Sequence, residues 1–587
     1  MQLYHNSRSA ECRAPLGAVP CGRPVRLRLF GAVNVGQAVL IWSVNGVRSF
    51  LPMIYAESDS YEIRLRMPEK PAICEYFFYV ENRDGAGEYY GNAWDGLGGV
   101  GVTSGPEPKP FQITVYDPAY RTPEYLRKGV MYQIFPDRFY RTGRPRSDRK
   151  NLLIHQNWDD VPLRRVDAVK VKDNYSLDFF GGTLKGIEMK LPYLKSLGVT
   201  VLYLNPIFKS RSNHRYDTGD YEQVDPMLGT QEDFEHLCAE AGRLGIHVML
   251  DGVFSHTGAD SKYFDFYGRY QSGGAYRDKD SVWKDWYKFR KWPDDYESWW
   301  GIKTLPCLDK ENPELQEYFL GEGGIVQRWV QSGASGWRLD VADELPMDYL
   351  RRLRKSVRAV KDDAVILGEV WEDASHKVTY GQMRSYCLGD TVDSVMNYPL
   401  RIVLIDFLLH RCDAGAVCRL VESQQENYPA PFYYSLMNLM GSHDRPRILS
   451  LLCGLAWGEE DHENKTQQPV PAHQLALGKQ RLLTMLRAIV SLPGIPCVYY
   501  GDECGVQGTA DPYNRGTFPW GHEDMELQEQ VRALLSLRKK PVLQTGSLSI
   551  RADGPDAFVI RRTISCGHDV FGDPAEDDVY EVRIQRP

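Results

Sequence analysis

Eight short apolar runs, each separated from the next by material of helical character, dominate the central part of this chain. Apolar runs bounded by turn residues are typical of strands buried on both faces, and their alternation with helices favours a parallel sheet. Eight such units predict a closed (β/α)8 barrel, an α/β fold whose reactive residues lie at the carboxyl ends of the strands. The predicted strands are residues 129–135, 199–204, 246–250, 335–339, 365–368, 394–396, 435–439 and 495–500.

Two of the connecting helices have clear sequence signals. Apolar residues recur at helical spacing within residues 187–197, which predicts one helix that Gly198 ends. A capping box at Thr230–Asp233 predicts the start of another helix, which Gly245 ends. The segment between the third and fourth strands is too long for a simple connection, so residues 257–320 are predicted to fold as an excursion domain beside the cleft.

The two ends of the chain have a different pattern from the barrel. Residues 1–118 contain runs that alternate apolar and charged side chains, such as Val25–Leu29, and predict an N-terminal β-sandwich. Residues 119–540 are then assigned to the catalytic barrel, and residues 541–587 to a short C-terminal β-region. This last region is too short for a full closing β-sandwich, so an incomplete sheet is expected there.

Charge and cysteine usage limit the classes of partner. A net charge of −8 argues against a nucleic-acid partner, which would require a basic face. No apolar run is long enough to span a membrane, and the start of the chain does not resemble a signal peptide. The 12 cysteines are scattered without metal-ligand spacing, which favours a reduced, cytoplasmic protein with no membrane partner.

Three of the predicted strands end in a carboxylate. Arg338 and Asp340 are two positions apart in Gly336–Asp340, so both side chains point to the same face, and the guanidinium is expected to keep the pKa of Asp340 low. Glu369 ends the next strand, and Asp444 follows a later one. Three carboxylates at the mouth of one barrel are suited to the cleavage of a glycosidic bond.

Four short motifs at strand ends, in this order along the chain, resemble those of the α-amylase superfamily of glycoside hydrolases. The resemblance covers residues 120–540 and implies the same barrel and a retaining mechanism with a covalent glycosyl-enzyme intermediate. Each motif alone is weak, but the four together are specific. They are Asp251–His256, Gly336–Asp340, Val365–Glu369 and Gly441–Asp444.

The resemblance also implies a role for each matching residue. Asp340 corresponds to the nucleophile, Glu369 to the general acid and base, and Asp444 to the third carboxylate, which binds ring hydroxyls of the distorted sugar. Arg338 would hold the nucleophile ionised. His256 and His443 would donate hydrogen bonds to hydroxyls of the sugar being cleaved.

Three further substrate contacts and one supporting residue are nominated. The segment Ser212–Asp217 resembles the loop whose Tyr stacks under the sugar at the cleavage point, which nominates Tyr216 with His214 nearby. Trp371 either stacks on the leaving-group sugar or packs in the core. Asp251 is assigned a supporting role through hydrogen bonds, outside the chemistry.

Details of the motifs indicate a branch of the superfamily. Residues 338–344, 305–309 and 296–301 resemble the neopullulanase, cyclomaltodextrinase and maltogenic-amylase branch, or the related amylopullulanases. The N-terminal module resembles a starch-binding-type sandwich, which leaves open a homodimer through this module. The debranching motif of pullulanases is absent, so α-1,4 links are the expected main target, with α-1,6 cleavage as a side activity.

We expect no cofactor, and in particular no calcium at the loop where this branch binds it. After Phe135–Phe139 the chain has Arg144, Arg146 and Ser147, with Asp148 as the remaining candidate ligand, and Thr183 replaces a second Asp. Calcium requires six to eight oxygen ligands.

The predicted function is therefore that of a retaining α-glucan hydrolase acting on maltodextrins, cyclodextrins, pullulan or starch. A transglycosylase shares the first half of this mechanism and stays open as an alternative. A non-catalytic homologue that binds glucans or proteins is the second alternative. It predicts a missing catalytic carboxylate, yet Asp340, Glu369 and Asp444 are all present.

Overall fold

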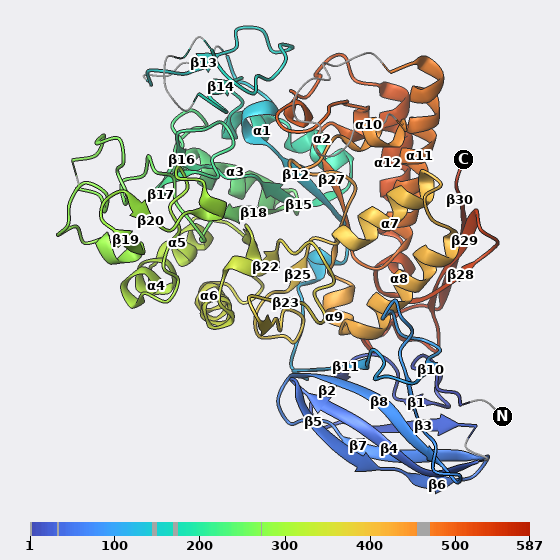
Figure 1. Cartoon of the computed structure of the whole chain (residues 1–587). Helices are drawn as coiled ribbons and strands as arrows, with labels where there is room; N and C mark the ends of the chain where they lie inside the picture. Colours follow the sequence, from blue (N-terminus) through green and yellow to red (C-terminus); the bar gives the residue numbers. More distant parts are fainter. Residues whose placement is uncertain are drawn as a thin grey trace.

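The computed structural model describes residues 3–31, 34–143, 149–167, 169, 174–271, 273–454 and 470–587. Three regions follow one another along the chain, as Figure 1 shows: an N-terminal pair of sheets, a central barrel with its helices, and a small C-terminal sheet. Within the described residues, no helix has the length and apolar character needed to cross a bilayer.

The N-terminal region is the predicted β-sandwich. One sheet has the order β1-β3-β7-β6, and the other has the order β10-β9-β8-β11-β2. In the second sheet β4 also pairs with β8, and β5 pairs with β4. Apolar side chains from both sheets form one core, and in β3 they alternate with less buried charged ones as predicted. The strands are Arg13–Ala14 (β1), Val19–Pro20 (β2), Pro24–Phe30 (β3), Val35–Val44 (β4), Val47–Pro52 (β5), Ile54–Ala56 (β6), Ser60–Arg66 (β7), Ala72–Asn82 (β8), Gly87–Gly91 (β9), Val102–Ser104 (β10) and Phe111–Tyr116 (β11).

The central region is the predicted (β/α)8 barrel. Its eight parallel strands have the order β25-β22-β21-β18-β15-β12-β27-β26, and a parallel bridge between Met396 and Met437 joins the two ends of this order. All eight strands fall on the runs predicted from the sequence. They are Val130–Ile134 (β12), Val199–Leu204 (β15), His247–Gly252 (β18), Gly336–Leu339 (β21), Val365–Gly368 (β22), Ser394–Val395 (β25), Met437–Leu439 (β26) and Ile495–Tyr499 (β27).

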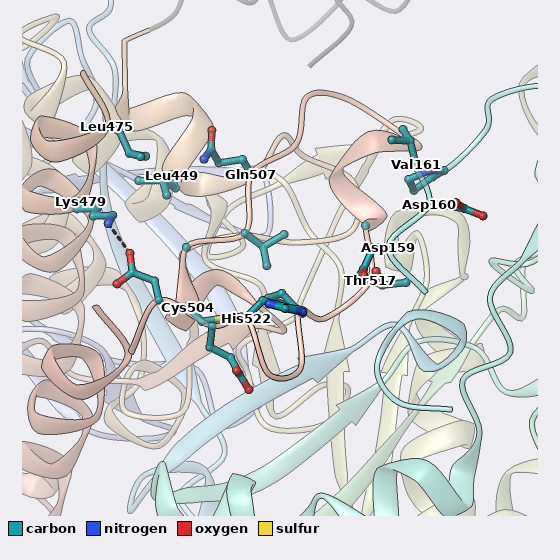
Figure 2. A pocket seen from close by; sticks show the side chains of 17 residues that line it. Asp159, Asp160, Val161, Leu449, Leu475, Lys479, Cys504, Gln507, Thr517 and His522 are labelled. Atoms are coloured by element: carbon teal, nitrogen blue, oxygen red, sulfur yellow. Dashed lines mark ion pairs between the residues drawn. The ribbon is translucent and has the colours of Figure 1, made fainter. Parts of the chain in front are cut away.

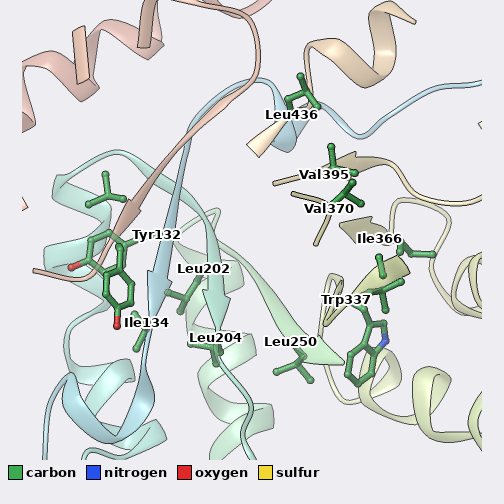
Figure 3. Packing of buried hydrophobic residues seen from close by; sticks show 14 of the residues in the cluster. Tyr132, Ile134, Leu202, Leu204, Leu250, Trp337, Ile366, Val370, Val395 and Leu436 are labelled. Atoms are coloured by element: carbon green, nitrogen blue, oxygen red, sulfur yellow. The ribbon is translucent and has the colours of Figure 1, made fainter. Parts of the chain in front are cut away.

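Alternation along each strand divides the barrel side chains into two sets. Outward-facing residues pack against the surrounding helices, and Figure 3 shows Tyr132, Leu202, Leu250 and Trp337 among them. Inward-facing residues such as Met249 belong to a separate cluster that fills the barrel. Because the barrel is filled with side chains, a substrate can reach only its end.

The helices surround the barrel. The predicted helix over residues 187–197 is in fact two helices, α1 and α2, because Pro192 at the start of α2 cannot donate the backbone hydrogen bond that would continue α1. The predicted capping box at Thr230 and Asp233 is present at α3. The helices of the layer are Leu184–Met189 (α1), Leu191–Ser196 (α2), Gln231–Arg243 (α3), Pro313–Leu320 (α4), Ile325–Gln331 (α5), Met347–Val360 (α6), Tyr398–Leu408 (α7), Ala414–Asn427 (α8), Ala430–Tyr433 (α9), Ile448–Leu452 (α10), Ala472–Ser491 (α11), Met525–Ser536 (α12) and Pro541–Thr545 (α13).

Excursions and the C-terminal sheet complete the fold. The excursion between β18 and β21 contains a small hairpin, whereas α4, near its end, packs on α5 and α6. The C-terminal sheet is antiparallel, with the order β28-β29-β30, and contacts α8 and α11. The remaining strands are Leu153–Ile154 (β13), Asp178–Phe179 (β14), Phe208–Ser210 (β16), Thr218–Val224 (β17), Phe289–Lys291 (β19), Asp295–Tyr296 (β20), Val378–Thr379 (β23), Gln382–Met383 (β24), Ser547–Ala552 (β28), Ala557–Ile564 (β29) and Asp578–Gln585 (β30).

Candidate active site

One arginine side chain organises the carboxyl end of the barrel. Arg338, on β21, is 1 % exposed and points inward, while its neighbours Trp337 and Leu339 face the helices. Its Nη1 donates to Asp340 Oδ1 at 2.9 Å and to Asp251 Oδ1 at 2.9 Å. Its Nη2 is 2.7 Å from Oε2 of Glu369. We call Arg338, Asp251, Asp340 and Glu369 the carboxylate cluster.

A strained backbone turn fixes Glu369 within this cluster. Val341, directly after Asp340, has a φ of 41° and a ψ of 60°, a left-handed conformation that costs energy for a β-branched residue. This turn directs the Val341 N–H to Glu369 Oε2 at 2.8 Å. Trp371 Nε1 donates to the other oxygen, Oε1, at 3.0 Å. Both oxygens of Glu369 are thus held from two directions.

Two tyrosines complete the coordination of Asp251. The hydroxyls of Tyr203 and Tyr216 donate to Asp251 Oδ2 at 2.6 and 2.7 Å. Asn205 Nδ2 in turn donates to the Tyr216 hydroxyl at 2.8 Å. The structure therefore places Asp251 behind Arg338 as a hydrogen-bonded support and brings Tyr216 into the same site.

His443 and Asp444 lie beside Tyr216. The rings of Tyr216 and His443 are stacked, with centroids 5.1 Å apart and an interplanar angle of 4°. Gln133 Nε2 is 2.9 Å from His443 Nδ1, and Asp444 Oδ1 is 3.2 Å from His443 Nε2. Arg515 Nε donates to the His443 carbonyl oxygen at 3.0 Å, which links this turn to the segment after β27.

The pKa of Asp340 differs from the sequence prediction, which was wrong. Burial raises its pKa well above the usual range, Arg338 opposes this effect, and the charges of Glu369 and Asp251 add to it. The reason is that Arg338 is shared among three carboxylates rather than paired with one. One positive charge cannot fully compensate three buried negative charges, so the pKa of Asp340 rises in spite of Arg338.

Asp444 and the two histidines also have altered proton affinities. Burial and the charge of Glu369 raise the pKa of Asp444, although 29 % of its side chain is exposed to solvent. Burial lowers the pKa of His256 to about 4, and burial also lowers that of His443, so both rings are neutral at pH 7. A neutral imidazole can still donate one hydrogen bond to a sugar hydroxyl.

His256 and His214 lie farther from the carboxylate cluster. His256, 2 % exposed, follows β18, and its Nδ1 is 2.9 Å from Ser255 Oγ. Its ring centroid is 5.6 Å from that of Trp299, and within the described residues no hydrogen bond joins it to the cluster. His214 Nδ1 accepts a hydrogen bond from the Tyr216 N–H at 3.1 Å, so it stabilises the backbone of the Tyr216 loop.

Trp371 is packed between two side chains. Its ring stacks on Tyr398, with centroids 3.9 Å apart and an interplanar angle of 6°. The guanidinium carbon of Arg445 lies 4.3 Å from the centroid of the Trp371 ring. Trp371 also belongs to the lining of a cavity, so part of this side chain outside the two contacts faces that space.

Several residues of the site were missed in the sequence. Tyr203 and Gln133 point inward from β15 and β12, and inward-facing polar residues near strand ends were the available signal. Nothing in the local sequence indicates the left-handed turn at Val341, because valine disfavours it. Asn205 and Arg515 lie beyond strand ends, in segments whose path depends on the tertiary fold.

The calcium loop expected from the sequence lies only partly within the described residues. Among the residues that the structure describes, no group of three or more His, Cys, Asp or Glu side chains could hold a metal ion. Thr183 Oγ1 accepts from the Gly186 N–H and so caps α1. Arg144, Arg146, Ser147 and Asp148, the other residues of the predicted loop, lie outside the described residues.

A separate cavity of about 450 Å³ lies beside the segment after β27 (Figure 2). Asp159 and Thr517 lie at one end of it, and an ion pair between Lys479 and Asp524 lies at the other. No member of the carboxylate cluster lines this cavity, so it is distinct from the candidate active site.

A (β/α)8 barrel with paired carboxylates held on one arginine at the carboxyl ends of its strands defines a barrel enzyme of the glycoside hydrolase class. Residues 133–540 match the family described as "Alpha amylase, catalytic domain". The chain belongs to the α-amylase family.

Individual relatives agree with this assignment. An amylopullulanase of Thermoanaerobacterium saccharolyticum is 37 % identical over 635 residues, a match that covers 100 % of this chain and 48 % of that protein. The chain therefore spans about half the length of this curated relative. The solved cyclic alpha-maltosyl-(1→6)-maltose hydrolase of Arthrobacter globiformis is 30 % identical, with a TM-score of 0.63, covering 76 % of this chain and 90 % of that one. The type III pullulan hydrolase of Thermococcus kodakarensis is 26 % identical, with a TM-score of 0.65, covering 96 % and 94 %.

Proposed function

We propose that this protein is a retaining α-glucan hydrolase that cleaves α-1,4-glucosidic bonds through a covalent glycosyl-enzyme intermediate. The observation that carries this proposal is that Arg338 bonds to Asp340 through one terminal nitrogen and to Glu369 through the other. Two carboxylates on one guanidinium lie close enough to act on the same glycosidic bond. Retaining enzymes use a separation of about 5–5.5 Å.

The first half of the reaction forms the intermediate. Asp340 Oδ2 attacks the anomeric carbon while Glu369 gives its proton to the glycosidic oxygen, so the bond to the leaving sugar breaks. Asp444 and His443 hold ring hydroxyls, and Tyr216, stacked parallel to His443, offers its ring to the sugar.

The second half releases the product. Glu369, now ionised, takes a proton from water, the hydroxide attacks the anomeric carbon, and the bond to Asp340 breaks. Two inversions give net retention of configuration. Arg338 stabilises the Asp340 carboxylate as it leaves, and Val341 N–H and Trp371 Nε1 keep Glu369 in place throughout.

The test is hydrolysis of a chromogenic α-maltoside by the wild type and by Asp340→Asn. We expect the variant to lose at least about 10³-fold in kcat, because the amide cannot act as the nucleophile. Far-ultraviolet circular dichroism serves as the folding control. Equal rates for the two folded proteins would refute the proposal.

The proposed substrates are maltodextrins, cyclodextrins, pullulan and starch, with α-1,6 cleavage as a side activity. The names of the relatives support α-glucans that contain both kinds of link. Products from maltotriose, β-cyclodextrin, pullulan and soluble starch distinguish the preferences. Panose from pullulan would indicate α-1,4 cleavage, whereas maltotriose would indicate α-1,6 cleavage.

A transglycosylase on the same substrates is the second candidate, since it differs only in the acceptor of the second half-reaction. The half-buried Trp371 beside Glu369 supports transglycosylation, because a sugar held there would compete with water for the glycosyl-enzyme intermediate. Products longer than the substrate at high maltotriose concentration would identify this activity. A purely glucan- or protein-binding role would instead be indicated if the wild type bound maltodextrin without cleaving it.

We further propose that catalysis needs no calcium. The support is that Thr183 caps α1 where the family resemblance calls for an Asp ligand. We expect EDTA to leave both the rate and the Tm unchanged. A drop in either that added calcium restores would contradict this proposal.

We also propose a cytoplasmic location and leave a homodimer through the N-terminal sandwich open to test. All 12 cysteines are free thiols, most of them buried, as expected in a reducing compartment. The cytoplasmic location predicts that twelve free thiols are titrated in the denatured, unreduced protein. Sedimentation of the whole chain and of a variant with charged substitutions on the exposed β5 tests the homodimer.

A further inference from the structure

A cavity of about 550 Å³ lies between the N-terminal sandwich and the barrel. The loop between β9 and β10 contributes Trp94 and Leu97 to its lining, and the segment after β22 contributes Trp371. Ile402 of α7 and Arg419 of α8 lie on the barrel side. We call this space the Trp94 cavity.

Trp94 is unusually open for its size. It is 86 % exposed, more than any other large apolar side chain among the described residues. Ile402, on the other side of the cavity, is 46 % exposed. Large apolar side chains left open around one concave space mark a binding site rather than a folding requirement.

The loop that carries Trp94 is held firmly in place. Arg8 donates to the Leu97 carbonyl oxygen, and its Nε and Nη1 donate to Glu426 and Glu422 of α8, each at 2.9 Å. Gly98 has a φ of +80°, and a Cβ there would overlap the Glu426 carboxylate. Trp94 is therefore presented on a rigid loop fixed against the barrel, and its exposure is not a result of a loose segment.

Trp371 belongs both to the lining of the Trp94 cavity and to the candidate active site. Trp371 lines the cavity and also donates a hydrogen bond to Oε1 of Glu369 at 3.0 Å. Glu369 is the residue that protonates the leaving sugar in the proposed function. A glucan leaving the Glu369 side of the site would meet Trp371 first and Trp94 beyond it.

The chemistry of the lining suits a carbohydrate. Aromatic rings offer flat apolar faces to the C–H faces of sugar rings, and carboxylates accept hydrogen bonds from sugar hydroxyls. Asp95 and Asp373 lie in the lining beside the two tryptophans. Arg419 Nε is 3.7 Å from Asp95 Oδ2, so a positive charge lies beside that carboxylate at the edge of the cavity.

From these observations we infer that the Trp94 cavity binds the leaving-group side of a long α-glucan chain, with Trp94 as the stacking platform farthest from the cleaved bond. This inference rests on the proposed function and adds a length preference to it. The N-terminal sandwich thereby contributes directly to substrate binding within the same chain.

The test compares a long and a short substrate. We expect Trp94→Ala to lower the ratio of kcat/KM for maltoheptaose to kcat/KM for maltotriose by about tenfold, mainly through a higher KM for maltoheptaose, as expected when an aromatic contact worth about 1.4 kcal/mol is removed. Phe50→Ala is the matched control, because Phe50 is an exposed aromatic (68 %) on the same sandwich and outside the cavity lining. The control should keep the wild-type ratio.

A binding measurement keeps this inference separate from the proposed function. Calorimetry with maltoheptaose on Asp340→Asn and on Asp340→Asn/Trp94→Ala should show about tenfold weaker binding for the double variant. An unchanged length ratio together with equal affinities would overturn the inference while leaving hydrolysis intact. If Trp94→Ala instead changed only the oligomeric state, the cavity would be a protein interface and the inference would be wrong.

Discussion

At the scale of single residues, the sharing of Arg338 decides the chemistry of the site. Its two terminal nitrogens reach three carboxylates, and a planar guanidinium provides these directions at once. A point charge would attract the same groups without fixing the angle between them. The relative position of Asp340 and Glu369 therefore depends on the shape of this side chain as well as on its charge.

The variant Arg338→Lys tests this dependence. Lysine keeps the positive charge but cannot bond to Asp340 and Glu369 from two separate nitrogens, so we expect kcat for maltotriose to fall by about 10²–10³-fold with the fold preserved. Steady-state kinetics and circular dichroism are the measurements. A loss smaller than about tenfold would mean that charge alone is sufficient.

The sequence predicted where the candidate residues lie in the fold better than it predicted the direction of their pKa shifts. Asp340, Glu369 and Asp444 lie at strand ends that apolar runs made visible, so their convergence followed from the barrel. The raised pKa of Asp340 could not be predicted, because it depends on how many carboxylates share Arg338. Likewise, the lack of a hydrogen bond between His256 and the carboxylate cluster within the described residues depends on the path of the chain after β18.

At the scale of elements, the boundary of each strand was easier to predict than the course of the segment after it. All eight barrel strands follow from buried apolar runs, which are a local signal. The break between α1 and α2 required attention to Pro192, which the apolar periodicity does not reveal. The loop from β9 to β10, which carries Trp94, is joined to α8, hundreds of residues away in the sequence, by the ion pair of Asp95 with Arg419 and by Arg8, which bonds to both segments.

The end of β27 provides a pH test. Burial raises the pKa of Asp502, in the turn after β27, from 3.8 to about 7, with Arg447 opposing the rise. Between these two values the unfolded chain has released a proton that the native state still binds, so this group makes the free energy of unfolding decrease as the pH rises from about 4 to about 7. Above about pH 7 it causes no further change.

We therefore expect Asp502→Asn, which cannot ionise, to lose less thermal stability than the wild type between pH 5 and pH 8. Calorimetric Tm values at several pH values in that window give the comparison. Parallel pH profiles for the two proteins would show that Asp502 is already ionised in the native state at pH 5.

At the scale of the whole molecule, Glu426 of α8 joins the sandwich to the barrel. Arg13 Nη1 is 3.2 Å from one oxygen of Glu426, and Arg8 Nε is 2.9 Å from the other. The side chains of Arg13 and Glu426 are almost fully buried, at 0 % and 4 % exposure. Removing one member of such a pair leaves a buried charge without compensation.

The variant Glu426→Gln should consequently lower the free energy of unfolding by about 3 kcal/mol and separate an early transition of the sandwich from that of the barrel. Differential scanning calorimetry of the full chain is the measurement. Glu422→Gln is the control, since Glu422 pairs with Arg8 at 36 % exposure and should cost less than about 1 kcal/mol. Equal effects of the two variants would contradict the assigned role of Glu426.

The left-handed turn at Val341 has a consequence for how this protein can be varied. In a saturation library at that position selected for folding alone, glycine and asparagine should outnumber valine, since they adopt the turn with less strain. Both selections should remove proline, because its ring cannot adopt the positive φ of this turn and it has no N–H to give to Glu369. The difference in residue frequencies at position 341 between the two selected libraries would measure how much backbone strain is compatible with activity when that strain holds Glu369 in position.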